Sequence, residues 1–378
     1  MPFDTLEIRI SLQKLLIGLT LVIVPLSFVG LYLASQAEAS LEQTIGELFR
    51  SAAQSESMAA SQFINDRVLD VADIASNPDV VGAITTGQRS RKGLDDPVVK
   101  ERIGKIESTW ETPQVDPLVK QILLSPTSQV LRRHREVDPR ILKILVADET
   151  GATVAATDKP LHYVQPNEVY WRAVYGEGRG GIYVSEIRYD AQSKATYLQI
   201  GMPVLEEGTR RFIGAVNALV DVSSLLSRFQ RAEVGQKVRI MLLQDDGTVI
   251  SAPNTDPSLR LKSDEYATVR DALATPQGRQ AGYAVANMRG GDRIVGFSDT
   301  GLKRVYPNLA WLVLASQDER EALTPLSGLS RFALLMVVFA LLMLTLLTVY
   351  FFLHRRQRFE DINVQAAEEP PRSGAAAA

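Results

Sequence analysis

The sequence KILVADETGATVAAT, residues 143–157, has the pattern of a strand, a tight turn and a second strand. Ile144 to Ala147 is an apolar run, and Asp148 to Gly151 supplies the turn. The second run is rich in small and β-branched residues, which suit a pleated surface. We therefore expect this segment to open a β-sheet.

An aromatic cluster and three further strand patterns follow this pair. Tyr163 precedes a helical insert that contains Tyr170 and Trp171. The strand patterns cover residues 196–200, residues 202–205 after a glycine, and residues 212–220. The predicted order is strand, turn, strand, helical insert and three strands.

The strand-turn-strand pattern returns about 95 residues later, which is typical of a duplicated fold. Its parts are residues 238–243, the turn Asp245-Asp246-Gly247 and residues 248–251. We predict a connecting helix at 223–233, a helix at 266–274, and strands at 282–286, 292–298 and 311–316. Fewer aromatic residues occupy the insert of this second copy, so we interpret it as a spacer and transmitter close to the membrane.

Two apolar segments flank this repeated region. Leu15 to Ala34 carries no charge and has about the length that crosses a bilayer. It exceeds the usual apolar region of a signal peptide, although the small residues at 34–37 leave cleavage as an alternative. Phe332 to Leu353 is a second apolar segment, and the basic cluster that follows at 354–358 marks the cytoplasmic side. The sequence predicts two spans, with both ends inside and residues 35–331 outside.

Residues 35–78 have a helical pattern that ends at Asn77-Pro78, because a residue before proline avoids the α region. A helix of that length rises about 60 Å, which makes it a stalk. Leu41, Ile45, Leu48 and Ala52 form an apolar stripe on it. The stripe predicts a homodimer seam, or packing against the chain's own sensor domain, and we expect both along different parts of the helix.

The order of elements, and the residues that fill it, resemble the membrane-distal module of a double Cache sensor, a PAS-like extracytoplasmic fold of bacterial receptors. The matching residues are Asp148, Gly151, Tyr170 to Ala173, Tyr183 to Ser185, Asp190, Gly201 to Val204, and Phe212 to Val216 with Asp221. With the second module and the flanking spans, the resemblance covers about Leu15 to Leu353.

The resemblance implies an α+β fold in which two Cache modules, each an antiparallel sheet with flanking helices, lie between two transmembrane helices. The expected divisions are a cytoplasmic leader at 1–14, the first span at 15–34, the stalk helix at 35–78, the membrane-distal module at 79–222, the membrane-proximal module at 223–322, the second span at 332–353, and a disordered cytoplasmic tail at 354–378.

The resemblance also implies where a ligand binds. In amino-acid-binding double Cache sensors an arginine two residues before a Trp-Tyr pair holds the ligand carboxylate, and a downstream aspartate takes its amine. Here the pair is reversed as Tyr170-Trp171, the arginine position holds Glu168, and Asp190 matches the aspartate. Two acids beside two rings suit a cation, so we expect an amine or an amino-acid-like ligand. The candidate ligand-binding residues are Tyr163, Glu168, Tyr170, Trp171, Arg172, Tyr183 and Asp190.

Two alternatives remain open for this cluster. The aromatic pair could pack the insert against the sheet while Glu168 faces water. Arg172 could instead turn inward as an anchor for a carboxylate, which would reverse the charge preference. The sequence does not decide between these arrangements.

Several classes of function are disfavoured by composition. The net charge is -3 and no long basic stripe occurs, so nucleic acid is not an expected partner. The chain has no cysteine, and its three histidines are far apart in sequence, so neither thiol chemistry nor a metal site is expected. Phosphate-loop, nucleophile-elbow and zinc-protease motifs are lacking. We expect no enzyme activity and no cofactor.

The sequence therefore predicts a transmembrane sensory receptor of a bacterial inner membrane, with a large periplasmic domain that binds a small solute. Since the sequence contains no output module, it would signal to a separate cytoplasmic protein such as a histidine kinase, or be the sensor fragment of a longer kinase or chemoreceptor. A two-span scaffold that regulates polysaccharide chain length is a different possibility, which the repeated strand patterns disfavour. A membrane-tethered hydrolase is the third.

Overall fold

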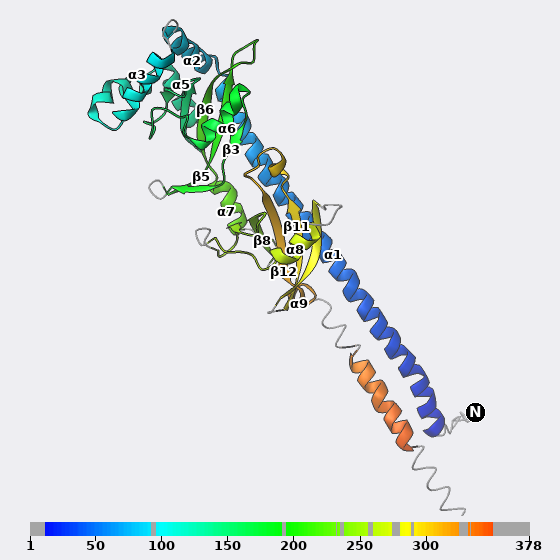
Figure 1. The fold of residues 1–378 in the computed structure, drawn as a ribbon. Helices are drawn as coiled ribbons and strands as arrows, with labels where there is room; N and C mark the ends of the chain where they lie inside the picture. The colour runs from blue at the N-terminus through cyan, green and yellow to red at the C-terminus, as the bar shows by residue number, and fades with distance from the viewer. Residues whose placement is uncertain are drawn as a thin grey trace, which may run out of the picture. The chain divides into compact units, whose positions relative to one another are not determined.

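The computed structural model describes residues 12–91, 96–190, 194–231, 233–234, 238–255, 260–273, 280–288, 291–324, 332 and 334–350 (Figure 1). The chain divides into two compact units, one formed by residues 46–318 and the other by the segments on either side. The predicted basic cluster and the predicted tail lie outside the described residues, as does the predicted leader up to residue 11.

The flanking unit contains two apolar helical segments. Helix α1 (Leu12–Ser76) begins in it, and its apolar part has a mean hydropathy of 2.2. Among the described residues this is the one helix long and apolar enough to cross a membrane, while Leu334–Tyr350 is a shorter apolar helix within the predicted second span. The Ser27 hydroxyl donates a hydrogen bond to the Met336 carbonyl at 3.1 Å, so the two segments are in contact.

The predicted span and stalk are therefore parts of one helix. Helix α1 contains Pro25 and ends at Ser76, directly before the Asn77-Pro78 stop that the sequence predicts. From residue 46 onward it belongs to the larger unit and buries one face there. The buried apolar side chains of that face include Phe49, Ala53, Ala60, Ile64, Val68 and Val71.

The first sheet of the larger unit is antiparallel throughout. Its strands are β1 (Ile141–Asp148), β2 (Thr153–Ala156), β3 (Tyr183–Val184), β4 (Arg188–Asp190), β5 (Ala195–Leu205) and β6 (Phe212–Asp221). Their order is β2-β1-β6-β5-β3, and β4 also pairs with β5. We call this sheet, with the helices α2 to α6 that follow, the first module.

Helices cover both faces of this sheet. Helices α2 (Pro78–Arg91) and α5 (Pro126–Val137) contact β1, and Ile84 of α2 lies against Gly214 of β6. Helix α6 (Val169–Tyr175), followed by the short η2 (Gly176–Gly178), packs on β5 and β6 from the other face. The helices α3 (Asp96–Ser108), η1 (Pro113–Val115) and α4 (Asp116–Leu123) surround a small separate core with Trp110 at its centre.

The second module repeats the antiparallel arrangement. Its strands are β7 (Glu233–Val234), β8 (Val238–Gln244), β9 (Val249–Ser251), β10 (Ala281–Met288), β11 (Gly291–Asp299) and β12 (Trp311–Asp318), in the order β10-β11-β12-β8-β7 with β9 paired to β8. Helix α7 (Ser223–Arg231) connects the modules, α8 (Tyr266–Leu273) is the insert, and η4 (Leu302–Arg304) joins β11 to β12. The short α9 (Glu319–Ala322) follows β12. The α+β fold with two antiparallel sheets is confirmed.

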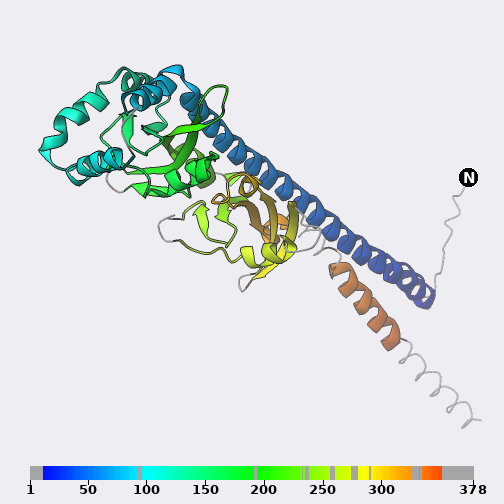
Figure 2. The ribbon, with the colours of Figure 1, turned by 45° about the horizontal axis from the view of Figure 1, so that its top comes forward.

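From residue 46 onward α1 runs alongside both modules (Figure 2), and hydrogen bonds and ion pairs attach it to them. The hydroxyls of Ser57 and Ser61 donate to the carbonyls of Asp299 and Thr300, at 2.9 and 2.5 Å. Glu56 accepts two hydrogen bonds from Arg228 of α7. Further along, Arg67 forms an ion pair with Asp138 at the end of α5. A shift of either module would therefore displace the part of α1 that the module contacts.

One sequence prediction in the first module is wrong. Residues 195–205 form a single strand, β5, without the break expected at Gly201. A β-carbon at that position would lie 2.7 Å from Cγ2 of Val174 and 3.3 Å from Cδ2 of Tyr170. The glycine permits the close approach of α6 to the sheet and does not form a turn. The short strands β3, β4 and β7 were not predicted as strands either.

Candidate functional site

The aromatic residues of α6 lie in the apolar layer between that helix and the sheet. Tyr170 is 1% exposed and Trp171 is 4% exposed. Trp171 meets Phe212 edge to face, with ring centroids 5.7 Å apart. Tyr183 of β3 belongs to the same cluster, together with Leu145 of β1. The structure therefore brings three of the candidate residues together, two from α6 and one from β3.

The Tyr170 hydroxyl has a defined partner in this layer. It donates a hydrogen bond to Oε1 of Gln165 at 2.9 Å. Burial, with a smaller contribution from the negative charge of Glu168, raises the pKa of Tyr170 far above its usual value. Burial also raises the pKa of Tyr183. Both phenols are therefore neutral hydrogen-bonding groups at physiological pH.

Asn217 adds a polar atom to this aromatic layer. It faces Leu145 on one side and Gly201 on the other in the strand register, so all three side-chain positions point to the face covered by α6. Its Oδ1 is buried and has no hydrogen-bond partner within the described part of the chain. A buried acceptor of this kind costs about 1–3 kcal/mol when it stays unpaired. It is suited to receive an N–H or O–H group from a bound molecule.

Sequence reasoning did not select Asn217. The signal was present, because asparagine interrupts the otherwise apolar run of Phe212 to Val220. What the sequence lacked was the pairing register, which places this residue beside Leu145 rather than on the opposite face.

Tyr163 lies outside the α6 cluster, in the small core around Trp110. The two rings are 5.2 Å apart, and the ammonium of Lys159 sits 5.3 Å from the Trp110 ring. The indole N–H of Trp110 donates to the Pro160 carbonyl at 2.9 Å. Tyr163 therefore helps to attach the segment after β2 to the α3–α4 region.

A carboxylate strengthens the same attachment. Glu107 of α3 accepts hydrogen bonds from the main-chain nitrogens of Tyr163 and Val164 at 2.8 and 3.0 Å. Its other oxygen lies 3.0 Å from Nδ1 of His162. Neither Glu107 nor Trp110 was a candidate from sequence, because residues 79–139 have a mixed polar pattern without a strand register to place them.

The three charged candidate residues, Glu168, Arg172 and Asp190, lie outside the packed aromatic layer. Glu168 is the residue before the first turn of α6, and its side chain makes no capping hydrogen bond. Arg172 is exposed on α6. Asp190 pairs with Ala195 of β5, whereas Tyr183 pairs with Gly201, and these β5 positions are six residues or about 20 Å apart at about 3.3 Å per residue. The structure does not bring Asp190 to the aromatic pair.

The geometry of the first module thus combines a packed aromatic layer, neutral phenols and a buried amide oxygen for which the described residues supply no partner. These groups can hold a small polar molecule by hydrogen bonds and ring contacts. No group of three or more histidine, cysteine or acidic residues suited to a metal occurs among the described residues.

Solved structures similar to this chain include sensory and ligand-binding domains of chemoreceptors. The sensory domain of Campylobacter jejuni chemoreceptor Tlp3 covers 75% of this chain and 98% of its own, with 8% identity and a TM-score of 0.49. The ligand-binding domain of Pseudomonas aeruginosa amino acid chemoreceptor PctB, in complex with L-arginine, covers 74% and 97%, with 15% identity and a TM-score of 0.42. That of PctC with GABA covers 73% and 99%, with 16% identity and a TM-score of 0.43.

The sequence itself matches the Cache domain over residues 37–326. A comparison with curated protein sequences finds no match. The matched region contains α1 from residue 37, both antiparallel sheets and their inserts. This chain belongs to the Cache domain family, whose double modules are ligand-binding sensors and not enzymes.

Proposed function

We propose that this protein is a transmembrane sensory receptor that binds a small extracytoplasmic solute in its first module. Binding would be passed through α1 to a separate cytoplasmic protein, such as a histidine kinase. The observation that carries the proposal is the continuity of α1, whose N-terminal part is apolar enough to cross a membrane and whose residues from 46 onward pack on the Cache modules. Membership of the Cache family supports the sensory role.

The proposed topology has two spans in a bacterial inner membrane, with both ends in the cytoplasm and the modules in the periplasm. It is tested by labelling single cysteines on intact cells, after permeabilising the outer membrane, with a thiol reagent that does not cross the inner membrane. Gln129→Cys suits the outer position because that residue is exposed, whereas the neighbouring Ser128 is fully buried. Its partner is Ser373→Cys in the tail. Equal labelling of the two variants would refute the two-span topology.

The proposed ligand is a small amine or amino-acid-like molecule held against Tyr170, Trp171 and Tyr183. An N–H donor on the ligand would satisfy Oδ1 of Asn217, which otherwise remains unpaired among the described residues. Support for a cation through Asp190 is weaker than the sequence suggested, because about 20 Å of strand separates that residue from the ring pair. Roles for Tyr163, Glu168, Arg172 and Asp190 remain predictions.

The ligand proposal is tested on the full chain in detergent by a thermal-shift screen of amines and amino acids, followed by calorimetry. Asn217→Leu should weaken binding of a hit by roughly ten- to a hundredfold, because a buried acceptor would be lost. Asp190→Ala serves as the comparison variant. A hit that binds wild type and Asn217→Leu equally would remove Asn217 from the site. A hit that requires a free carboxylate would point to Arg172 as its anchor.

A homodimer is part of the proposal, because a stalk helix gains most of its stability by burying an apolar stripe. Leu48 is 63% exposed on α1, while its neighbours Phe49 and Ala53 are buried against the chain's own module. Of the stripe predicted from sequence, Leu48 is exposed and Leu41, Ile45 and Ala52 are half-buried, so the face of α1 that carries Leu48 is an outer face. The outer face is available to a second copy of the chain.

A scaffold that regulates polysaccharide chain length is less well supported. The expectation for that class is an external part dominated by long helices. The larger unit here contains two antiparallel sheets of the Cache type. This difference favours the receptor.

A further inference from the structure

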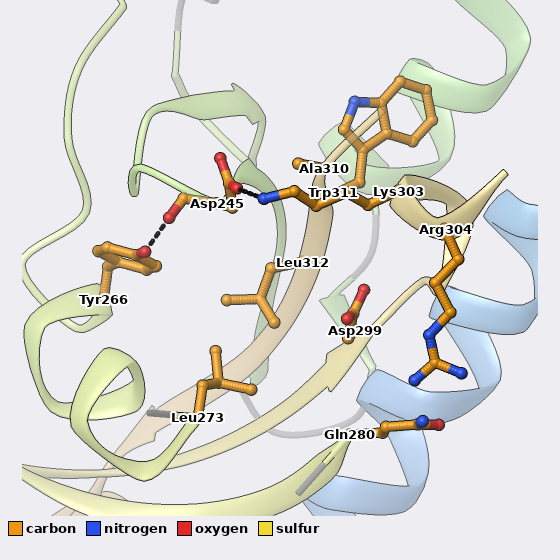
Figure 3. A pocket seen from close by; sticks show the side chains of 10 residues that line it. All are labelled: Asp245, Tyr266, Leu273, Gln280, Asp299, Lys303, Arg304, Ala310, Trp311 and Leu312. Atoms are coloured by element: carbon orange, nitrogen blue, oxygen red, sulfur yellow. Dashed lines mark hydrogen bonds and ion pairs between the residues drawn. The ribbon is translucent and has the colours of Figure 1, made fainter. Parts of the chain in front are cut away.

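A cavity of about 310 Å³ lies in the second module, away from the aromatic layer of the first (Figure 3). Helix α8, the turn between β8 and β9, and the segment between β11 and β12 contribute its walls. Its apolar surface comes from Leu273, Ala310 and Leu312. The volume is at the lower end of the range for small-molecule sites. The proposed function makes no use of this cavity.

One side of the cavity is closed by groups that already have partners. The Lys303 ammonium pairs with the Asp245 carboxylate at 2.5 Å. The Tyr266 hydroxyl donates a hydrogen bond to the Asp245 carbonyl. Figure 3 shows these three side chains gathered on one side of Leu312. These residues shape the cavity, and the charges of Lys303 and Asp245 neutralise each other.

The opposite side presents an acid and a base that do not pair with each other. Oδ1 of Asp299 accepts a hydrogen bond from the main-chain nitrogen of Gly301. Within the described part of the chain, Oδ2 of Asp299 and the guanidinium of Arg304 take part in no hydrogen bond or ion pair, although both residues line the cavity. Figure 3 places them beyond Leu312 from Tyr266. A carboxylate and a guanidinium are therefore both available to one occupant.

We propose that this cavity binds a small zwitterion, independently of the ligand of the first module. Its ammonium would pair with Asp299, its carboxylate with Arg304, and its short apolar part would lie on Leu273 and Leu312. Charge-assisted hydrogen bonds of these two kinds are the strongest that such groups form. A plain amine would leave Arg304 without a partner, and a plain carboxylate would leave Asp299 without one.

Asp299 also connects the cavity to the stalk. Its carbonyl accepts the hydrogen bond of Ser57, and the carbonyl of the next residue, Thr300, accepts that of Ser61. An occupant held by the Asp299 side chain would therefore fix the main chain that α1 contacts. Binding that favours one position of this segment would stabilise the corresponding position of the helix.

The three tryptophans of the chain permit a test that separates the two modules. Trp311 lines the cavity, whereas Trp110 and Trp171 belong to the cores of the first module. The full chain in detergent is labelled with 5-fluorotryptophan, and the three fluorine resonances are assigned with Trp110→Phe and Trp171→Phe. The labelled protein is titrated with L-valine and γ-aminobutyrate as zwitterions, and with butyrate and butylamine as singly charged controls.

The expected result is a saturable shift of the Trp311 resonance with at least one zwitterion and with neither singly charged compound. Asp299→Asn, which retains the acceptor for Gly301, and Arg304→Gln should each weaken that binding by roughly ten- to a hundredfold. Arg179→Gln is the matched control, because this exposed arginine pairs with Glu177 at the surface of the first module, and the variant should bind as wild type does.

Three outcomes would overturn the inference. They are a Trp311 resonance unmoved by either zwitterion at millimolar concentration, an equal response to butyrate or butylamine, and wild-type affinity in both cavity variants. A response of the Trp171 resonance alone would support the proposed function while refuting this site. A response of Trp311 alone would support this site while counting against the first-module ligand.

Discussion

Nδ2 of Asn308 donates a 2.8 Å hydrogen bond to the main-chain oxygen of Val184, which joins the second module to strand β3 of the first. Val184 directly follows Tyr183 of the aromatic layer. The segment that carries Asn308 also contacts α1, through Asp299 and Thr300. A continuous series of contacts therefore links the candidate ligand site, the second module and the stalk.

Removing the Asn308 amide should uncouple the two modules while leaving each folded. In Asn308→Ala the Val184 carbonyl loses this partner, at a cost of about 1 kcal/mol. We expect faster hydrogen exchange in peptides that contain β3 and residues 299–310, with unchanged exchange in β8 and β12. Asn167→Ala, at an exposed position of the first module, is the control. Unchanged exchange at β3 would mean that the hydrogen bond does not hold the modules together.

A second prediction concerns the packing of α1 on the second module. A β-carbon at Gly296 of β11 would collide with the main chain of Phe49 and Arg50, which cannot move aside as a side chain can. Gly296→Ala should therefore lower the free energy of unfolding by about 1–3 kcal/mol, which is typical of overpacking. The measurement is thermal unfolding of the full chain in detergent.

Gly104→Ala is the control for this substitution. Apart from its chain neighbours and the backbone of α3 itself, no atom of the described residues lies within 4 Å of a β-carbon at Gly104, and alanine favours a helix over glycine by about 1 kcal/mol. Gly296→Ala should therefore lower the melting temperature, and Gly104→Ala should raise it. Equal melting temperatures for Gly296→Ala and wild type would show that α1 does not pack closely on β11.

The architecture was predictable from sequence because its signals are local. The apolar runs and the turns between them each depend on neighbouring residues, and their recurrence about 95 residues later is visible without any tertiary contact. Gly201 shows where this reasoning fails. Glycine can mark a turn or a close approach, and the deciding contact, with Val174 and Tyr170, comes from a helix some 30 residues earlier.

The candidate site was predictable only in part, for a related reason. Tyr170 and Trp171 are adjacent in sequence, so the sequence alone predicts that they lie close together. The distance between Tyr183 and Asp190 depends on how β3 and β4 pair along β5, which places them at separate positions on one long strand. Asn217 likewise gains its place only through the register of β6.

A third prediction follows from a buried carboxylate in the second module. Glu265 is 4% exposed and pairs with Arg293 of β11 at 2.7 Å. Burial raises the pKa of Glu265, but hydrogen bonds from Ser263, its own main chain and Arg293, with the charge of Arg293, outweigh this and lower the pKa below its usual 4.5. Glu265→Gln should cost about 1.5–3 kcal/mol of stability at neutral pH.

The pH dependence checks the assignment. A carboxyl group whose pKa is lower in the folded state stabilises the fold above the unfolded value of 4.5, and loses that contribution as pH falls through the lower folded value. Urea unfolding measures the free energy of unfolding of both proteins. The difference between wild type and Glu265→Gln should be constant above pH 4.5 and shrink below it. Glu101→Gln, at an exposed position of α3, should track wild type. A difference that persists in acid would indicate packing instead of charge.

A fourth prediction concerns the attachment of the segment after β2. Glu107→Ala leaves the main-chain nitrogens of Tyr163 and Val164 without their carboxylate acceptor. The loss should be about 1–3 kcal/mol, with faster hydrogen exchange in peptides covering residues 159–165. Glu101→Ala, at an exposed position of the same helix, should leave that exchange unchanged. Equal exchange in both variants would show that Glu107 does not secure the segment.

The last prediction tests the dimer on the outer face of α1. Leu48 and Leu69 are each 63% exposed, and their separation is a multiple of seven residues, so they lie along one seam of a two-helix coiled coil. Leu48→Cys should therefore crosslink to its twin in a second copy much faster than Glu47→Cys, which lies about 100° around the helix. The measurement is the yield of disulfide-linked dimer after brief oxidation of the full chain in membranes. Leu69→Cys should behave like Leu48→Cys if the seam extends along the stalk. Crosslinking that is equal at positions 47 and 48 would refute a dimer seam on this face of α1.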